Sequence, residues 1–134
     1  MDSLAKRSLQ LAVAVGSLVP ISAGAAGMLL GPRLVGAAIV GPPDLDSHFR
    51  YLSGLLLAIG LGYASTIPRI EAHGGRFRLL TGIVVLGGIG RLLSLLSIGP
   101  PSPTMIAALV MELVVTPCLA LWQHRVALQA RCAL

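Results

Sequence analysis

Four long apolar runs restrict the possible folds of this chain more than any other feature. Each run is near the roughly 20 residues that an α-helix needs to cross a bilayer. Hydrophobic residues make up 55% of the 134 residues and charged residues 11%, against about 25% charged residues in soluble domains. The runs are continuous, whereas the strands of a transmembrane barrel alternate. We therefore predict an all-α integral membrane four-helix bundle, a single domain over residues 1–134, with helices over residues 9–30, 51–67, 77–98 and 104–122.

Basic residues at the ends of the runs predict how the helices are oriented. Seven lie on one side of the predicted bundle and two on the other: Lys6, Arg7, Arg69, Arg76, Arg78, Arg125 and Arg131 against Arg33 and Arg50. The positive-inside rule then places both termini in the cytoplasm. The net charge of +5 is spread over helix ends, so we expect the lipid bilayer as a partner and no nucleic acid.

Two features of the first third of the chain leave alternatives open. Lys6, the apolar run that follows and the small residues 22–25 resemble a secretory signal peptide. Apolar character continues through Met28 and Leu30, which favours an uncleaved first helix over cleavage within residues 1–25. Leu34–Val40 is apolar but too short to span, so we predict an interfacial or re-entrant segment within the outer loop 31–50.

Arg91 and Glu112 are the charged residues inside the strongly apolar runs. The loop Gly99–Pro103 separates their two runs, and each charge is about 12 Å along its helix from that loop. A charge in the bilayer is costly, so such residues usually face a partner or a polar cavity. We predict a contact between Arg91 and Glu112, in a polar pocket completed by Ser94 and Ser22. The pair is either a buried ion pair that fixes helix register or part of a functional site.

Asp44, Asp46, His48 and Arg50 form a second polar cluster on the outer side, just before the second run. Alternating Asp and His residues suggest a metal site, but three ligands would leave it incomplete. Acidic residues near a helix N-terminus suit the helix dipole, and we predict that Asp46 or Ser47 caps the helix. We expect no metal, no cofactor and no catalytic residue set.

Glycines on the faces of the apolar runs predict where helices pack closely. Small residues let two backbones approach in the membrane, where association depends on close packing. Pro117 in the fourth run removes a backbone donor and frees the carbonyl of Leu113. The glycines that we expect at helix contacts are Gly87, Gly88, Gly60 and Gly24.

Four segments together resemble a known family: residues 48–54, residues 67–71, residues 87–94, and Glu112-Leu113 with Leu121-Trp122. The sequence is similar over roughly residues 45–126 to an uncharacterised family of small bacterial four-helix membrane proteins, known as domain of unknown function 4345. The resemblance implies an integral membrane protein of a bacterium and supplies no reaction, cofactor or catalytic residue. We predict that the chain is a multi-pass protein of the bacterial cytoplasmic (inner) membrane. A looser similarity to the DoxX type of four-helix membrane protein is an analogy of fold.

Two functions from different classes fit these residues. We favour a non-catalytic accessory or interaction subunit that packs against other membrane subunits or against itself, because the soluble mass is small and the helix faces are rich in glycine. The alternative is a small membrane enzyme, or a protein that binds a lipid or quinone-like ligand, that uses the pair of Arg91 and Glu112.

Overall fold

The computed structural model describes residues 3–36 and 42–132, which contain helices and no strand. The all-α fold class is confirmed. The described elements are, in chain order, α1 (Ser3–Leu30), the 3₁₀ helix η1 (Gly31–Val35), α2 (Pro43–Ala64), the 3₁₀ helix η2 (Ile67–Arg69), α3 (Gly74–Ile98), α4 (Pro103–Val110), the π-helical turn η3 (Met111–Val115) and α5 (Thr116–Cys132).

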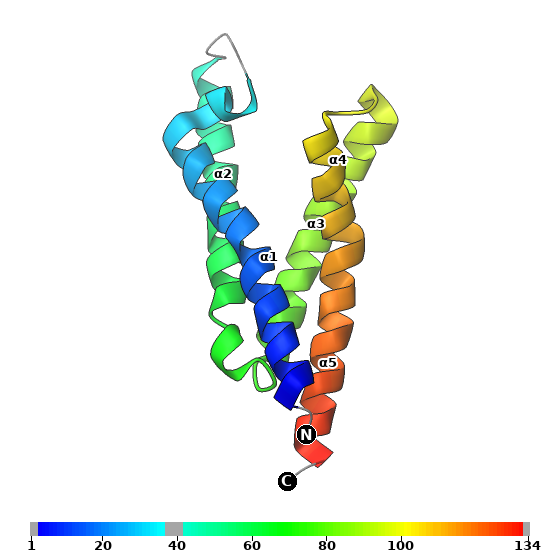
Figure 1. The fold of residues 1–134 in the computed structure, drawn as a ribbon. Coiled ribbons are helices and arrows are strands. Elements are labelled where there is room, and N and C mark those ends of the chain that lie inside the picture. The colour runs from blue at the N-terminus through cyan, green and yellow to red at the C-terminus, as the bar shows by residue number, and fades with distance from the viewer. Residues whose placement is uncertain (1–2, 37–41, 133–134) are drawn as a thin grey trace. The chain divides into compact units, whose positions relative to one another are not determined.

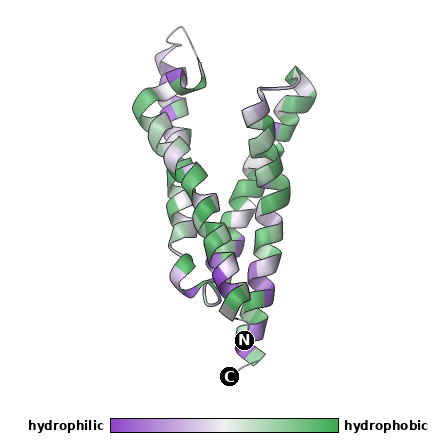
Figure 2. Cartoon of the chain, viewed as in Figure 1, coloured by the Kyte–Doolittle hydropathy of each residue, from purple (hydrophilic) through white to green (hydrophobic). Residues whose placement is uncertain are grey.

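Four helical stretches are long and apolar enough to cross a membrane: Leu4–Val35, Pro43–Arg69, Gly74–Ile98 and Pro103–Cys132. The four helices predicted from the apolar runs therefore exist. At about 1.5 Å per residue, the 25 residues of α3 reach about 37 Å, more than the roughly 30 Å of a hydrocarbon core. Figure 2 shows apolar residues along the middle of the helices and polar residues towards their ends.

Two helix ends differ from the predicted bounds. Helix α2 begins at Pro43 rather than near residue 51, because proline suits the first helical position, where its missing N–H removes no bond. Asp44 and Asp46 thus lie inside the first turn. The prediction that Asp46 or Ser47 caps this helix is wrong, and the residue at the cap is Pro42. The last helix continues to Cys132 instead of ending near residue 122.

The connection after α1 folds into η1, which starts at a glycine in the left-handed backbone region, Gly31 with φ of 61°. Gly36, with φ of 80°, follows its end. Residues 37–40 of the predicted interfacial segment Leu34–Val40 lie outside the described residues. The interfacial or re-entrant position of this segment stays a prediction.

The contacts of the chain group into two compact units, which we describe separately. The N-terminal unit is Ala12–Ile67, and the C-terminal unit is Met1–Leu11 with Pro68–Leu134. In Figure 1 most of α1 runs beside α2, and α3 runs beside the continuous rod of α4, η3 and α5. Each unit is therefore built around a pair of long helices.

Close approaches at glycines hold the helix pair of the N-terminal unit. A Cβ atom at Gly24 would lie 2.5 Å from the backbone nitrogen of Leu57 and 2.8 Å from the carbonyl oxygen of Ser53. A Cβ atom at Gly60 would lie 2.9 Å from the backbone nitrogen of Ile21. Backbones meet at both places, so only glycine fits without moving a helix.

The C-terminal unit has a small core near the connection that precedes α3. Its most buried side chains are Leu9, Ile70, Phe77, Gln123 and Val126. The side-chain nitrogen Nε2 of Gln123 donates to the carbonyl oxygen of Ile70 at 2.8 Å, which ties α5 to that connection. A buried amide costs free energy unless it is hydrogen-bonded, and this bond satisfies Nε2 while Oε1 of Gln123 has no partner among the described residues.

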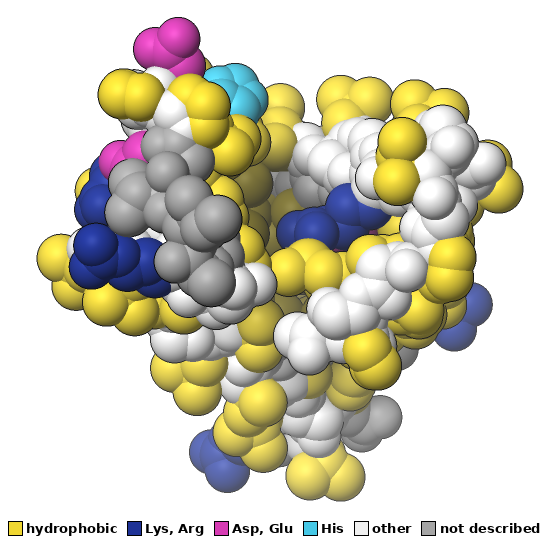
Figure 3. Space-filling model, turned by 90° about the horizontal axis from the view of Figure 1, so that it is seen from above, with side chains coloured by type: hydrophobic (Ala, Val, Ile, Leu, Met, Phe, Trp, Pro, Cys, Tyr) yellow, Lys and Arg dark blue, Asp and Glu magenta, His cyan; other side chains and the backbone are white. Residues whose placement is uncertain are grey.

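Beyond this core, most of the apolar surface of the C-terminal unit is uncovered by its own chain. In the most apolar stretch of α3, 6% of the residues are buried, and in that of Pro103–Cys132, 0%. Soluble monomers rarely expose contiguous apolar surface on this scale. Seen from above in Figure 3, hydrophobic side chains cover much of the visible surface and charged ones are few. This surface requires another apolar cover.

Candidate functional site

The strongest polar contact between α3 and the rod of α4, η3 and α5 joins Arg91 to Glu112. Nε of Arg91 donates to both carboxylate oxygens of Glu112, at 2.9 Å to Oε1 and 3.0 Å to Oε2. Each residue lies on the helix that its apolar run predicted, roughly 10 Å and 14 Å along that helix from the connection between them. The contact predicted from the matched positions of these residues is therefore present.

Gly88 allows the two elements to meet at this depth. A Cβ atom at Gly88 would lie 2.9 Å from Cβ of Glu112 and 2.7 Å from Cδ2 of Leu113. The glycine is itself buried. The predicted close approach at Gly88 thus places Glu112 against α3, within reach of an arginine one turn further along.

Glu112 lies in a π-helical turn, which was not predicted from the sequence. The turn spans Met111–Val115, and the backbone N–H of Thr116 bonds the carbonyl of Met111, five residues earlier. The Thr116 hydroxyl donates to the same carbonyl at 2.8 Å. Pro117 has no backbone N–H and could not bond the carbonyl of Leu113 in a regular α-helix. The wider turn therefore costs no hydrogen bond from Pro117. Such turns occur frequently at functional sites.

The ion pair is not buried, and the prediction of a buried ion pair is unsupported. The side chain of Arg91 is 39% exposed and that of Glu112 is 18% exposed. On the α3 side of Arg91, Gly87 and Ser94 add little side chain that could cover the guanidinium. A charged side chain exposed to this extent is ordinary on a protein surface that faces water. On a surface that faces the hydrocarbon core, the same charge would be unsolvated.

The guanidinium of Arg91 uses only part of its donor set. Its Nη1 donates to the thioether sulfur of Met105 at 3.1 Å, a weak acceptor that was not predicted from the sequence. Among the described residues, Nη2 has no acceptor. A guanidinium fork matches a carboxylate or phosphate with two parallel bonds. The uncovered edge of Arg91 can therefore take a further oxygen ligand.

The flank of α3 beside Arg91 carries small residues. Gly87 and Ser94 lie four residues before and three residues after Arg91, on the same side of the helix. Both are exposed, and a Cβ atom at Gly87 would meet no described atom within 4 Å. The prediction that Gly87 packs against a helix finds no contact within the described chain, so its face is open to another molecule.

Ser22, the fourth predicted member of the pocket, belongs to the N-terminal unit. Its hydroxyl donates to the carbonyl of Leu18 at 2.7 Å, one turn back in the same helix. Such a bond satisfies a hydroxyl locally in an apolar helix. A pocket shared by Ser22 and Arg91 stays a prediction.

The predicted outer cluster consists of Asp44, Asp46, His48 and Arg50, and only Asp46 and Arg50 among them are joined by a salt bridge. Arg50 donates through Nε to Asp46 at 2.7 Å, and through Nη1 to the carbonyls of Met28 at 2.5 Å and Leu29 at 3.1 Å. These carbonyls belong to the last turn of α1, where no intrahelical donor reaches them. Asp44 and His48 are exposed. Arg50 therefore caps the C-terminal end of α1 by bonding its last carbonyls.

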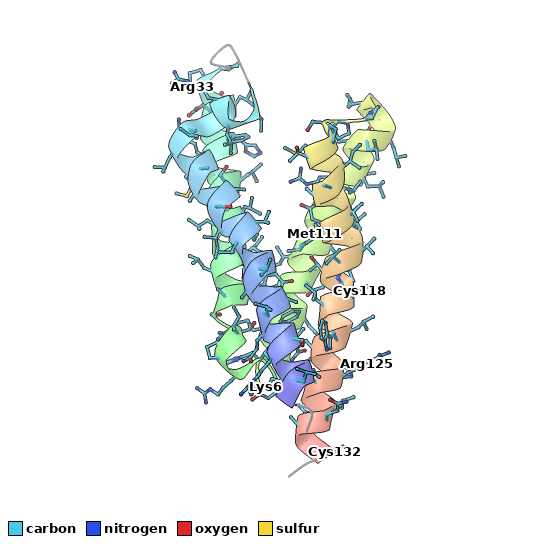
Figure 4. All side chains as sticks on the ribbon, in the orientation of Figure 1. Lys6, Arg33, Met111, Cys118, Arg125 and Cys132 are labelled. Carbon is cyan, nitrogen blue, oxygen red and sulfur yellow. The ribbon has the colours of Figure 1, made fainter. Side chains whose placement is uncertain are left out.

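Residues 3–36 and 42–132 contain no group of three or more His, Cys, Asp or Glu side chains that could hold a metal ion. Cys118 and Cys132 are both free and exposed. In the sticks of Figure 4, Cys118 lies on the long rod below Met111, and Cys132 lies near the C-terminal end. The chemistry available at the candidate site is thus that of a guanidinium, a carboxylate and small neighbours.

Comparison with known proteins identifies the family of this chain but supplies no activity for it. No curated protein and no solved structure matches the chain. A family model matches residues 8–123, which include α2, α3 and the pair of Arg91 and Glu112. The chain belongs to the family described as domain of unknown function (DUF4345).

Proposed function

We propose that this chain is an integral membrane protein of a bacterial inner membrane and acts as a non-catalytic interaction subunit. In this role, the α3 flank of Gly87, Arg91 and Ser94 packs against a helix of another membrane polypeptide. Both termini lie in the cytoplasm, in keeping with the basic residues near them. The observation that carries the proposal is the partly exposed ion pair between two helices whose most apolar stretches have few buried residues.

The cost of exposing a charge to hydrocarbon supports a protein cover for this flank. On the mildest scale, arginine at the bilayer centre costs about 2.5–3.5 kcal/mol. Pairing with Glu112 neutralises the charge, but the uncovered Nη2 still lacks an acceptor among the described residues. A neighbouring helix that supplies a carbonyl, hydroxyl or carboxylate oxygen would satisfy it.

The small residues of the same flank determine how near such a helix can come. Gly87 leaves open space where any other residue would place a side chain, and Ser94 adds only a hydroxymethyl group. Membrane helices associate through faces of this kind, because small residues let backbones approach and polar groups bond across the contact. A polar group beside small residues therefore favours a neighbouring helix, rather than lipid, as the molecule that covers this flank of α3.

Photo-crosslinking tests the proposal in membranes. A benzophenone amino acid replaces Ser94 in one protein and Leu96 in the control, since Leu96 is exposed and lies on the opposite side of α3. We expect the Ser94 position to yield a polypeptide adduct of increased mass that weakens in Arg91→Gln, and the Leu96 position to yield lipid adducts. Adducts of Ser94 with only lipid or the same chain would overturn the proposal, as would equal polypeptide adducts from both positions.

A second candidate function rests on the uncovered guanidinium edge itself. Arg91 beside Met105 presents a cationic fork next to apolar side chains, which suits a lipophilic molecule with an oxygen-rich head, such as a lipid or quinone. This ligand-binding protein or small enzyme predicts that the purified protein retains such a molecule and loses it in Arg91→Gln. Mass spectrometry of organic extracts from both proteins decides, with Arg33→Gln as the control.

A further inference from the structure

The thioether of Met105 lies against the guanidinium of Arg91. Nη1 of Arg91 donates to the sulfur at 3.1 Å, while Nε of Arg91 holds the carboxylate of Glu112. The bonds to Glu112 fix the guanidinium in place and leave its two terminal nitrogens to other partners. A thioether is a weak acceptor, so the terminal nitrogens of a cationic group are poorly satisfied at this contact.

The second terminal nitrogen of Arg91, Nη2, has no acceptor among the described residues. Nη2 is bonded to the same carbon atom as Nη1, so its N–H groups lie near the sulfur of Met105. The sulfur has two lone pairs, and the bond from Nη1 uses one of them. An oxygen atom attached to this sulfur would therefore lie within reach of unused donors.

The contact lies close to the connection between α3 and α4. Met105 is two residues after the start of α4 at Pro103, a rise of roughly 3 Å. The backbone of Arg91 is roughly 10 Å from the end of α3 at Ile98, so its side chain extends towards the connection to reach the sulfur. Long cationic side chains extend in this way towards water. Because Met105 is partly exposed, a small oxidant dissolved in water can reach it.

Oxidation of a thioether by hydrogen peroxide transfers one oxygen atom. A sulfur lone pair attacks a peroxide oxygen, and the S–O bond forms as the O–O bond breaks. The proton of the transferred oxygen passes to the leaving hydroxide, which departs as water, so sulfur loses two electrons and the peroxide gains them. Negative charge develops on the leaving hydroxide in the transition state. A cationic N–H donor fixed beside the sulfur lowers the barrier by stabilising that charge.

The sulfoxide product suits Arg91 better than the thioether does. A sulfoxide is polar, and its oxygen carries partial negative charge, so its bond with a guanidinium is charge-assisted and strong. Without a donor, the same polar oxygen on an apolar helix would cost free energy. Arg91 therefore favours both the formation of a sulfoxide at Met105 and its accommodation in the folded protein.

Met28 is a methionine in a similar position that lacks such a donor. It lies two residues before the end of α1 at Leu30, so its distance from a helix end matches that of Met105. Met28 is 43% exposed, more than Met105. No described residue donates to its sulfur, and Arg50 bonds its backbone carbonyl instead. Exposure alone thus predicts faster oxidation of Met28, whereas the contact with Arg91 predicts faster oxidation of Met105.

We infer that Met105 is an oxidation site, at which a peroxide converts the thioether to a sulfoxide whose oxygen accepts hydrogen bonds from the unused donors of Arg91. The inference goes beyond the proposed function, because it assigns a chemical modification to the contact itself. It rests on residues of the C-terminal unit alone. It stands whether or not a partner helix binds the α3 flank.

Peroxide treatment of the full purified chain in detergent tests the inference. Hydrogen peroxide is added at one concentration, samples are quenched with catalase over time, and mass spectrometry of peptides follows the added oxygen at Met105 and Met28. In the unaltered protein, Met105 should gain oxygen at least about threefold faster than Met28, the effect of less than one hydrogen bond to a developing charge. This ratio of two rates within one molecule needs no variant.

Variants then test whether Arg91 is the cause. Arg91→Leu/Glu112→Leu removes the donor without leaving a carboxylate unpaired, and the ratio of the two rates should fall below one, because exposure then decides. Arg125→Leu is the matched control and should keep the ratio of the unaltered protein. It removes an exposed arginine of α5 that lies towards Cys132 in Figure 4.

The stability of the oxidised protein provides a second measurement. In a Met28→Leu/Met111→Leu background, peroxide treatment should leave resistance to sodium dodecyl sulfate unchanged or raised while Arg91 is present. The same treatment should lower this resistance once Arg91→Leu/Glu112→Leu is added, because the sulfoxide then has no donor. Three results would each overturn the inference: oxidation of Met28 as fast as that of Met105, an unchanged ratio without Arg91, or an equal loss of resistance with and without Arg91.

Discussion

Arg50 and Arg91 each hold a carboxylate, yet they serve their two units differently. Arg50 donates through Nε and Nη2 to Asp46 and through Nη1 to the end of α1, so all three nitrogens bond within its own unit. Arg91 gives Nε to Glu112 and Nη1 to a thioether. The difference teaches that pairing alone does not make an arginine structural. What matters is how many of its donors the local fold already uses.

The same contrast exists between glycines. Gly24 of the N-terminal unit faces backbone atoms of α2, while Gly88 of the C-terminal unit faces the side chains of Glu112 and Leu113. Backbone atoms of a helix cannot move alone. At Gly88, Leu113 can change its rotamer, and only Cβ of Glu112 is fixed to its backbone. The N-terminal pair is therefore the more rigidly specified of the two contacts.

The largest expected effect tests this rigidity. Gly24→Ala should destabilise the protein by about 3 kcal/mol, because overpacking against backbone forces two helices apart. Gly88→Ala should cost less, about 2 kcal/mol, since Leu113 can change its rotamer although Cβ of Glu112 moves only with its backbone. Resistance to unfolding by sodium dodecyl sulfate in mixed micelles measures both.

Two open glycines supply the controls for these substitutions. Gly16→Ala and Gly87→Ala place a Cβ atom where no described atom lies within 4 Å. Both should be neutral or stabilise by up to about 1 kcal/mol, because alanine has the higher helix propensity. If Gly88→Ala proves as damaging as Gly24→Ala, the distinction between backbone and side-chain contacts fails.

Double-mutant cycles compare the two ion pairs directly. With glutamine at one or both positions, the coupling between Arg91 and Glu112 should be about 1–2 kcal/mol, between the values for exposed and buried pairs. The coupling between Arg50 and Asp46 should be smaller, because solvent screens this exposed pair and Arg50 also bonds the carbonyls of α1. A larger coupling at Arg50 would contradict the roles assigned here.

The smallest expected effect is a pH dependence at the Lys6–Glu71 salt bridge of the C-terminal unit. The pKa of Glu71 is lowered from 4.5, so its contribution to stability is fully present above that value and lost as pH falls through the lower folded value. The loss should stay below about 1 kcal/mol, since the pair is partly exposed. Unfolding of the unaltered protein and of Glu71→Gln at about pH 6 and about pH 3 measures it. A difference between them that does not shrink at the lower pH would count against the salt bridge.

Most of the helical fold was predictable, because backbone bonding makes a long apolar run helical wherever water is absent. The contact of Arg91 with Glu112 was also predictable, from two charges at equal spacing from one proline-rich turn. The π-helical turn and the contact of Arg91 with Met105 were not predictable. Pro117 was a signal that the helix departs from regular α-helical bonding near the turn. The start of α2 was missed because the polar residues that follow Pro43 resemble a loop.

The sequence by itself determined the four apolar helices, the family and the concentration of basic residues at one set of helix ends. These properties follow from local composition and periodicity. Only the tertiary structure decided that Gly88 is covered while Gly87 is open, that Arg50 is saturated while Arg91 is not, and that Gln123 joins α5 to Ile70. Neighbouring residues on one helix have the same local chemistry, and what separates them is the rotation of that helix against its partner.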